Sequence, residues 1–416
     1  MRHSMRVCDL TTLYIDEGEG GVNTYLREKA AYFARERPDV EHTLVIPAAH
    51  DELRRLGKSK LYCIKSPRYF RNPQHRLLLN NRAITRVLRE VAPDLVEADG
   101  SSLLARTAER ALRPTQPGQR KPAIVGFYHV HLAPFFARKV GSTFGRMVAS
   151  LFENITWQYT RQCLKPCDRV VVSSRDILQR LEGHGLGELV HIPLGVNTDL
   201  FHPSAPPNGN ATRDDTVTIL FVGRLSKEKD LPVLFSAFER LEPADRFVLR
   251  IVGDGPLRSE VESFAKQHSN VEYLGLCPYG EHLANIYRQA DIVAIPSPAE
   301  TFGLTILEAL ASGVPVIGIN QGGPAHIVTP ELGALARPGD PSDFAAKLEE
   351  VARRRLSRQN CRAEIVQEYS WSKTFDRLSA LYGELLGIEE EPKRGAPSDA
   401  MPRQTIPDSR SVIRNP

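Results

Sequence analysis

Short runs of β-branched and other apolar residues alternate along most of the chain with segments that repeat an apolar residue every third or fourth position. The first pattern is typical of buried strands and the second of helices packed on a sheet. Their alternation predicts an α/β fold with two doubly wound parallel sheets in tandem. The expected strands are Arg6–Leu10, Thr43–Ile46, Leu95–Ala98, Ala123–Phe127, Arg169–Val172 and Leu189–Ile192, then Val217–Val222, Phe247–Val252, Val271–Leu274, Ile292–Ile295 and Val314–Ile319.

Length and one polar segment set the expected domain organisation. A chain of 416 residues exceeds the roughly 250–300 residues that one hydrophobic core serves. The segment HPSAPPNGNATRDD is rich in Pro, Asn and charge and is interpreted as a linker. We expect a first domain over 1–200, a linker over 201–216, a second domain over 217–368, a C-terminal helix over 369–388 and a disordered tail over 389–416.

Composition narrows the class of protein only slightly. No run approaches the ~18 consecutive apolar residues of a membrane-spanning helix, and the N-terminus lacks the apolar core of a secretory signal. We therefore expect a cytoplasmic protein, soluble or peripheral at the inner face of the cell membrane. The six cysteines lack metal or redox spacing and are expected to be reduced.

The candidate chemistry lies in the loops after the strands, where ligands of doubly wound folds bind. The segment GEGG opens a helix, and Gly20 and Gly21 could seat a phosphate at its N-terminus. A turn without a ligand is an equal alternative. In FVGRLSKEKDL, Gly223 precedes Arg224 and Lys229, two cations that could hold a diphosphate or could belong to a solvated turn.

The segment PAETFGLTILEALASG places two glutamates around the start of a helix that is expected to begin near Gly303 and end at Gly313. Glu300 falls in the loop, and Glu308 about one turn into the helix. A buried glutamate is unfavourable unless it is satisfied, and ligand hydroxyls would satisfy Glu308. The free N–H groups at the helix start are a candidate phosphate site and belong to Phe302, Gly303, Leu304 and Thr305.

These segments resemble the retaining nucleotide-sugar glycosyltransferases of the GT-B fold that carry an E-x₇-E motif, the family 4 or group 1 type. ETFGLTILE matches the motif. The resemblance runs from GEGGVNTYL through GFYHVH, VVVSS, HIPLGVNTDLFHP, FVGRLSKEKDL, VGDGP, ADIVAIPS and ALASGVPVIG to the glycine pair at 322–323. It implies two facing Rossmann-like domains with a cleft between them, and a C-terminal helix that braces the first domain.

The resemblance also implies roles for the donor site. Gly21 and its neighbours would contact the donor phosphate, and Arg224 and Lys229 the diphosphate. Glu300 would hydrogen-bond the donor sugar and Glu308 the ribose.

Two histidines and the reaction course complete what the resemblance implies. His129 matches the family's sugar-contacting histidine, whereas His131 would serve the acceptor or have no role. Retention would proceed by attack on the face from which the diphosphate leaves, which requires stabilisation of the leaving group. No D-x-D motif lies near the cleft loops, so neither a metal nor another cofactor is expected.

A basic stretch supplies the expectation about the acceptor. Residues 54–89 hold eleven Lys and Arg and no acidic residue, either as a solvated face or as a patch for anionic lipid. In the second case, the residues available to dip into the membrane interface are Leu61, Tyr62, Tyr69 and Phe70. The helix at the end of the stretch would face the sheet with Leu77, Ile84, Val87, Leu88 and Val91. The candidate membrane or acceptor residues, besides His131, are Arg54, Arg55, Lys58, Lys60, Lys65, Arg68, Tyr69, Phe70 and Arg71.

The sequence therefore favours a retaining hexosyltransferase that uses a UDP- or GDP-hexose. GFYHVHLAPFF is most similar to mannosyl-, glucosyl- and sulfoquinovosyl-transferases, which favours a lipid acceptor of the diacylglycerol or phosphatidylinositol type. A polysaccharide, oligosaccharide or small-molecule acceptor stays open, as do a sugar-nucleotide epimerase, a phosphorylase and a hydrolase with paired carboxylates. Nucleic acid is not an expected partner, because the basic residues lack an aromatic stacking platform.

Overall fold

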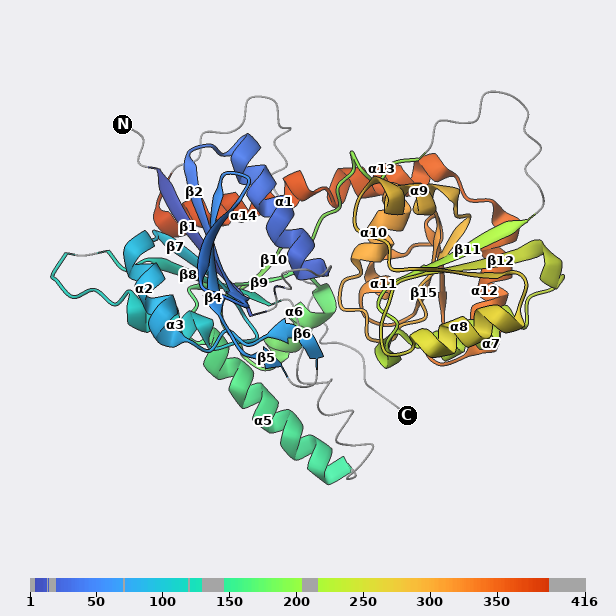
Figure 1. The fold of residues 1–416 in the computed structure, drawn as a ribbon, viewed down its shortest axis with the longest axis horizontal. Coiled ribbons are helices and arrows are strands. Elements are labelled where there is room, and N and C mark those ends of the chain that lie inside the picture. Colours follow the sequence, from blue (N-terminus) through green and yellow to red (C-terminus); the bar gives the residue numbers. More distant parts are fainter. Residues whose placement is uncertain are drawn as a thin grey trace, which may run out of the picture.

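The computed structural model describes residues 4–12, 14, 20–69, 72–118, 120–128, 146–203 and 216–388. It contains two α/β domains that lie side by side, each built on a largely parallel sheet flanked by helices (Figure 1). The predicted fold class is thereby confirmed. Within these residues, no helix combines the length and apolar character that a membrane crossing requires.

The first domain has an eight-stranded sheet in the order β10-β9-β8-β7-β1-β2-β4-β3, parallel except for the edge strand β3. Its strands are β1 (Met5–Leu10), β2 (Val40–Ala48), β3 (Glu52–Leu56), β4 (Ser59–Lys65), β7 (Leu95–Asp99), β8 (Ala123–Tyr128), β9 (Arg169–Val172) and β10 (Leu189–His191). A separate two-stranded sheet pairs β5 (Arg68–Tyr69) with β6 (Asn72–Arg76). The helices are α1 (Gly21–Glu36), α2 (Asn81–Val91), α3 (Leu104–Ala111), α5 (Arg146–Leu164) and α6 (Arg175–Gly183).

The second domain has a six-stranded parallel sheet in the order β13-β12-β11-β14-β15-β16. Its strands are β11 (Val217–Val222), β12 (Phe247–Val252), β13 (Val271–Gly275), β14 (Ile292–Ala294), β15 (Val316–Ile319) and β16 (Gly333–Ala336). The helices are α7 (Leu231–Phe238), α8 (Arg258–Gln267), α9 (Glu281–Gln289), α10 (Leu304–Ala311), α11 (Gly323–Ile327), α12 (Pro341–Arg354) and α13 (Arg358–Glu368), with short 3₁₀ turns η1 (Lys227–Lys229) and η2 (Ala244–Arg246). Successive strands are added on one side of β11 up to β13 and on the other side from β14 onward. Such sheets bind ligands at the point between β11 and β14 where the order of strands switches sides.

The basic stretch is mostly β-structure, which the sequence analysis did not predict. It forms the β3–β4 hairpin at the sheet edge and the small β5–β6 sheet before it reaches α2. Ile84 and Leu88 of α2 are buried as expected. Leu77 precedes the helix and is exposed, so its assignment to the packed face was wrong.

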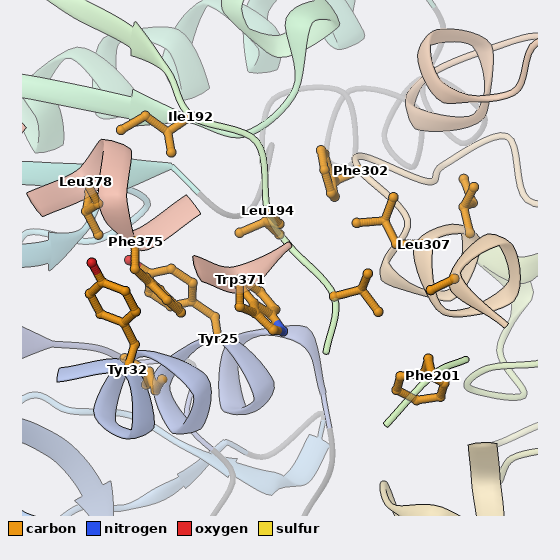
Figure 2. Packing of buried hydrophobic residues seen from close by; sticks show 14 of the residues in the cluster. Tyr25, Tyr32, Ile192, Leu194, Phe201, Phe302, Leu307, Trp371, Phe375 and Leu378 are labelled. Atoms are coloured by element: carbon orange, nitrogen blue, oxygen red, sulfur yellow. The ribbon is translucent and has the colours of Figure 1, made fainter. Parts of the chain in front are cut away.

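A last helix, α14 (Trp371–Leu386), returns to the first domain and lies against α1 (Figure 1). Ser370 caps its start by accepting a hydrogen bond from Lys373 N, and Gly387 ends it in the left-handed conformation. Its buried face carries Phe375, whose ring lies 5.6 Å from that of Tyr25 on α1 (Figure 2). Helix α14 therefore completes the core of the first domain.

A buried charge cluster lies under the same helix. The Lys29 ammonium is fully buried, donates to Asp9 Oδ1 at 2.8 Å and to the Tyr382 hydroxyl at 3.0 Å, and lies 2.9 Å from Glu97 Oε1. Tyr382 in turn donates to Glu97. Opposite charges inside a core are tolerated when they are paired and hydrogen-bonded. Glu97, a residue of β7, is thus a member of this buried cluster.

Two chain segments cross between the domains side by side. Val196 and Ser370 form a parallel β-bridge, with Val196 N donating to Tyr369 O at 2.8 Å. A Cβ at Gly195 would lie 2.5 Å from Trp371 N, so only glycine permits this close approach. The two crossings form one double-stranded junction between the domains.

Candidate functional site

The candidate site is built on the two loops that leave β11 and β14, the neighbouring strands at which the sheet order reverses. The first loop carries Arg224 and Lys229, and the second carries Glu300. Lys229 Nζ lies 2.5 Å from Glu300 Oε2, and the two side chains are 24% and 15% exposed. The structure therefore brings the predicted cation and carboxylate together at the place where doubly wound sheets bind ligands.

Turn glycines position the loop that holds Arg224. A Cβ at Gly253 would lie 1.9 Å from Gly223 O, and one at Gly255 would lie 2.5 Å from Leu225 O. The segment VGDGP therefore packs its backbone directly on the Arg224 loop. Arg224 itself is exposed at this surface.

The second glycine pair supports the Glu300 loop in the same way. Gly323 N donates to Glu300 O at 2.8 Å. A Cβ at Gly322 would lie 2.4 Å from Glu300 O, and one at Gly323 would lie 2.3 Å from Phe302 O. These contacts fix the backbone that presents the Glu300 carboxylate.

Helix α10 begins directly after this loop. Its N-cap is Gly303 at φ +92°, which offers no side chain to the first N–H groups of the helix. The positive end of the helix dipole therefore lies beside Glu300, with backbone donors at Leu304 and Thr305. Phe302 is buried beneath the loop. The arrangement suits an anionic group held next to a hydroxyl-bearing one.

Glu308 lies on the second turn of α10 and is 8% exposed. Its Oε2 accepts a hydrogen bond of 2.8 Å from the hydroxyl of Tyr287, a fully buried residue of α9. Burial and the nearby Glu308 raise the pKa of Tyr287 well above its ordinary value, so the phenol stays a donor. The buried Glu308 carboxylate therefore has a hydrogen-bond donor within the protein, in addition to any ligand hydroxyl. No sequence motif pointed to Tyr287.

The start of α1 faces the start of α10 across the two domains. A Cβ at Gly21 would lie 3.2 Å from Leu304 Cδ1, while Gly20 is exposed in an extended conformation. Figure 1 shows α1 on the side of the first domain that is turned toward the second. Two helix N-termini therefore border the same space.

Several predicted residues are not part of this arrangement. His129, His131, Phe70 and Arg71 lie outside the described residues. Arg54, Arg55, Lys58, Lys60, Lys65 and Arg68 are exposed on or beside the β3–β4 hairpin and β5, and Tyr69 lies in β5.

The hairpin changes two expectations about membrane contact. Arg54 forms an ion pair with Glu52, just outside the stretch that lacks acidic residues. Leu61 is buried, and the Tyr62 hydroxyl donates to Glu90 at 2.7 Å. The prediction that Leu61 dips into a membrane was therefore wrong, because alternation along β4 turns this side chain into the core.

Comparisons with known proteins match both halves of the chain. The family described as Glycosyltransferase Family 4 matches residues 19–200, and Glycosyl transferases group 1 matches residues 207–367. Among solved structures, sucrose-phosphate synthase from Thermosynechococcus elongatus is similar with a TM-score of 0.74 and 18% identity, covering 92% of this chain and 100% of that one. The fold is GT-B, and the chain belongs to the glycosyltransferases of the group 1 and family 4 type.

Two curated relatives refine this picture. The GDP-mannose-dependent alpha-mannosyltransferase of Corynebacterium glutamicum is 29% identical over 323 residues, covering 74% of this chain and 71% of the relative. The sulfoquinovosyl transferase SQD2 of Arabidopsis thaliana is 26% identical over 318 residues, covering 73% of this chain and 59% of the relative. The similarity to mannosyl- and sulfoquinovosyl-transferases noted from the sequence is thereby confirmed.

Proposed function

We propose that this glycosyltransferase moves a hexosyl group from a UDP- or GDP-hexose to a membrane-lipid acceptor with retention of anomeric configuration. The observation that carries the proposal is the Lys229–Glu300 pair beside the N-terminus of α10, which joins a cation, a carboxylate and backbone donors in one place. The relative from Corynebacterium, named for GDP-mannose, supports a nucleotide-sugar donor.

The donor would occupy the space between these groups. Arg224, Lys229 and the first N–H groups of α10 would hold the diphosphate and stabilise the negative charge that develops on it. Glu300 would accept a hydrogen bond from a sugar hydroxyl, and Glu308 from the ribose. The Lys229–Glu300 contact keeps both groups paired before the donor binds, so the donor has to share or replace that contact.

The reaction would then proceed on one face of the sugar. The bond between the anomeric carbon and the diphosphate oxygen breaks, the acceptor hydroxyl bonds to the same face, and its proton passes to the departing diphosphate oxygen. In this scheme, Arg224 and Lys229 carry the leaving-group charge and no side chain has to act as the base. Metal independence follows as a proposal, since side-chain cations fill the role that a metal could have.

The acceptor is proposed to be a lipid of the diacylglycerol or phosphatidylinositol type. Support comes from the relative named sulfoquinovosyl transferase and from the exposed cations of the β3–β4 hairpin, where Arg55 and Lys60 pair across the strands. Cations near an anionic membrane surface contribute about 1 kcal/mol each to binding. Peripheral attachment through this hairpin is part of the proposal.

The test incubates purified protein with UDP- and GDP-hexoses, with and without anionic vesicles that contain diacylglycerol or phosphatidylinositol, and with and without EDTA. Nucleotide release and the anomeric configuration of the product, determined by NMR, are the measurements. Turnover of one donor to an α-linked glycolipid from an α-linked donor, unaffected by EDTA, supports the proposal. Turnover only with soluble glycans would show that the acceptor is a glycan and not a lipid. If the protein neither binds nor turns over any sugar nucleotide, the proposal is overturned.

A further inference from the structure

A buried tyrosine hydrogen-bonds Glu308, one of the two carboxylates of the proposed sugar-nucleotide site. Tyr287 donates its hydroxyl hydrogen bond to Glu308 Oε2 at 2.8 Å and has no exposed surface. A carboxylate offers about four lone-pair positions, and the tyrosine uses one of them. The hydrogen bond from Tyr287 therefore restricts the rotation of the Glu308 carboxylate.

The ring of Tyr287 is held by a residue of the inter-domain segment. Phe201 is fully buried, and its ring meets that of Tyr287 edge-on at 5.6 Å and 84°. The Phe201 ring also meets that of Tyr279, at 5.5 Å and 62°. Figure 2 shows Phe201 on the side of the second domain, near the helix that carries Leu307.

The chain around Phe201 is itself clamped to the second domain. Arg362 of α13 donates to Phe201 O at 2.8 Å and to Thr198 O at 2.9 Å. Arg288, the neighbour of Tyr287 on α9, donates to Leu200 O at 3.3 Å. The segment that leaves the first domain therefore forms one wall of the tyrosine's pocket and is fixed there by two arginines.

From this geometry we infer that Tyr287, supported by Phe201, is a positioning residue for donor binding: it orients the Glu308 carboxylate toward the ribose hydroxyls of the nucleotide sugar. The inference rests on the proposed function. It adds that the inter-domain segment takes part in donor recognition through packing, although it makes no contact of its own with the donor. An oriented carboxylate binds a diol better than one free to rotate, because less freedom is lost on binding.

The ribose contact is the same in the bound donor and in the transition state, because the ribose lies away from the reacting carbon. Its loss therefore weakens binding without slowing the chemical step. A positioning role at Glu308 predicts a higher KM for the donor with kcat nearly unchanged. A role limited to stabilising the fold would instead lower the melting temperature and leave KM alone.

The experiment compares Tyr287→Phe, Phe201→Leu and Glu308→Gln with the wild-type full-length chain, with UDP and GDP as calorimetric probes and the turned-over sugar nucleotide as kinetic probe. Tyr287→Phe is expected to weaken nucleotide binding about tenfold, the scale of one hydrogen bond to a charged group. Phe201→Leu is expected to weaken it in the same direction. In the double variant Tyr287→Phe/Phe201→Leu, the loss of nucleotide affinity should be smaller than the sum of the two single losses, because both substitutions act through the same tyrosine.

Tyr382→Phe is the matched control, since Tyr382 also donates to a buried glutamate but belongs to α14, which packs on the first domain. It should lower stability and leave nucleotide affinity unchanged. Weakened binding in Glu308→Gln with unchanged affinity in both Tyr287→Phe and Phe201→Leu would overturn the positioning role and leave the proposed donor site intact. No nucleotide binding by the wild type would overturn the proposed function itself. Because Phe201→Leu leaves the Tyr287 side chain in place, the inference stays testable if Tyr287→Phe fails to fold.

Discussion

Lys229 and Glu300 come from loops 71 residues apart in sequence, yet Lys229 Nζ lies 2.5 Å from Glu300 Oε2. Both side chains are more than three-quarters buried. Removing one ion leaves the other partly desolvated and unpaired, which is unfavourable. The contact thus links the two loops and prepares a cation for an incoming diphosphate.

Lys229→Ala is expected to lower kcat about 10²–10³-fold, the scale reported for the loss of one group that stabilises a developing negative charge. Steady-state rates with the turned-over donor provide the measurement. Lys227→Ala, two residues earlier in the same 3₁₀ turn, is the control and should retain wild-type rates. Equal activity of the two variants would remove Lys229 from the diphosphate site.

Gly21→Val should impair donor use through a contact across the domains. Even a Cβ at this position lies 3.2 Å from Leu304 Cδ1, so the larger side chain pushes the start of α1 away from α10. We expect a rise of about tenfold in donor KM with little change in melting temperature. The test is rescue: Leu304→Ala in the same chain should restore KM, and failure to restore it would mean that this contact is not the cause of the weakened donor binding.

Gly323→Ala should disturb the Glu300 loop from behind. The added Cβ would lie 2.3 Å from Phe302 O, and relief requires the loop to move. Overpacking of this kind costs about 1–3 kcal/mol of unfolding free energy, and activity should fall further than stability explains. Gly183→Ala in α6, where a Cβ meets nothing within 4 Å, is the matched control for denaturation and rate measurements.

Glu28 predicts a pH-dependent effect at the domain junction. This α1 carboxylate accepts from Asn197 Nδ2 at 3.1 Å and from the Tyr279 hydroxyl at 3.5 Å, and burial raises its pKa above the ordinary 4.5. Because the pKa of Glu28 is higher in the folded protein than in the unfolded chain, the folded state favours the protonated carboxyl. Ionisation of Glu28 as the pH rises through the folded pKa therefore lowers the stability of the fold. Glu28→Gln should therefore melt at a higher temperature than the wild type at pH 7, with a difference that shrinks toward pH 4.

Thermal denaturation across that range provides the measurement. Glu36→Gln, on the exposed side of the same helix, should show no such trend. If Glu28→Gln melts lower than the wild type at pH 7, the ionised carboxylate is itself required at the junction.

Strand runs with strong apolar character were predictable from sequence almost to the residue. Val217–Val222 and Phe247–Val252 match β11 and β12 at both ends. The sequence analysis missed β3 and β4 because Lys and Arg interrupt both strands, and because the edge strand β3 has no buried residue. It missed β16, GALA, because small residues carry little strand preference.

The sequence allowed candidate site residues to be named where a charged side chain falls in a loop after a predicted strand or at the start of a predicted helix. Arg224, Lys229, Glu300 and Glu308 were singled out because they lie after strands or at a helix start, where doubly wound folds bind ligands, and because the two glutamates match the E-x₇-E motif. The support of Glu308 by Tyr287 and Phe201 could not be inferred, because it depends on helix α9 and the linker meeting in space. The packing of Gly253 on Gly223 was hidden for the same reason.

The buried Lys29 cluster has a consequence for biosynthesis. Lys29, Asp9 and Glu97 are made early, whereas Tyr382 and the rest of α14 are among the last described residues to leave the ribosome. Until they arrive, the first domain holds three charged groups beneath an uncovered apolar surface. The first domain to be synthesised is therefore the last to be completed, and a chain released before residue 371 would leave that surface open to the cell's chaperones and proteases.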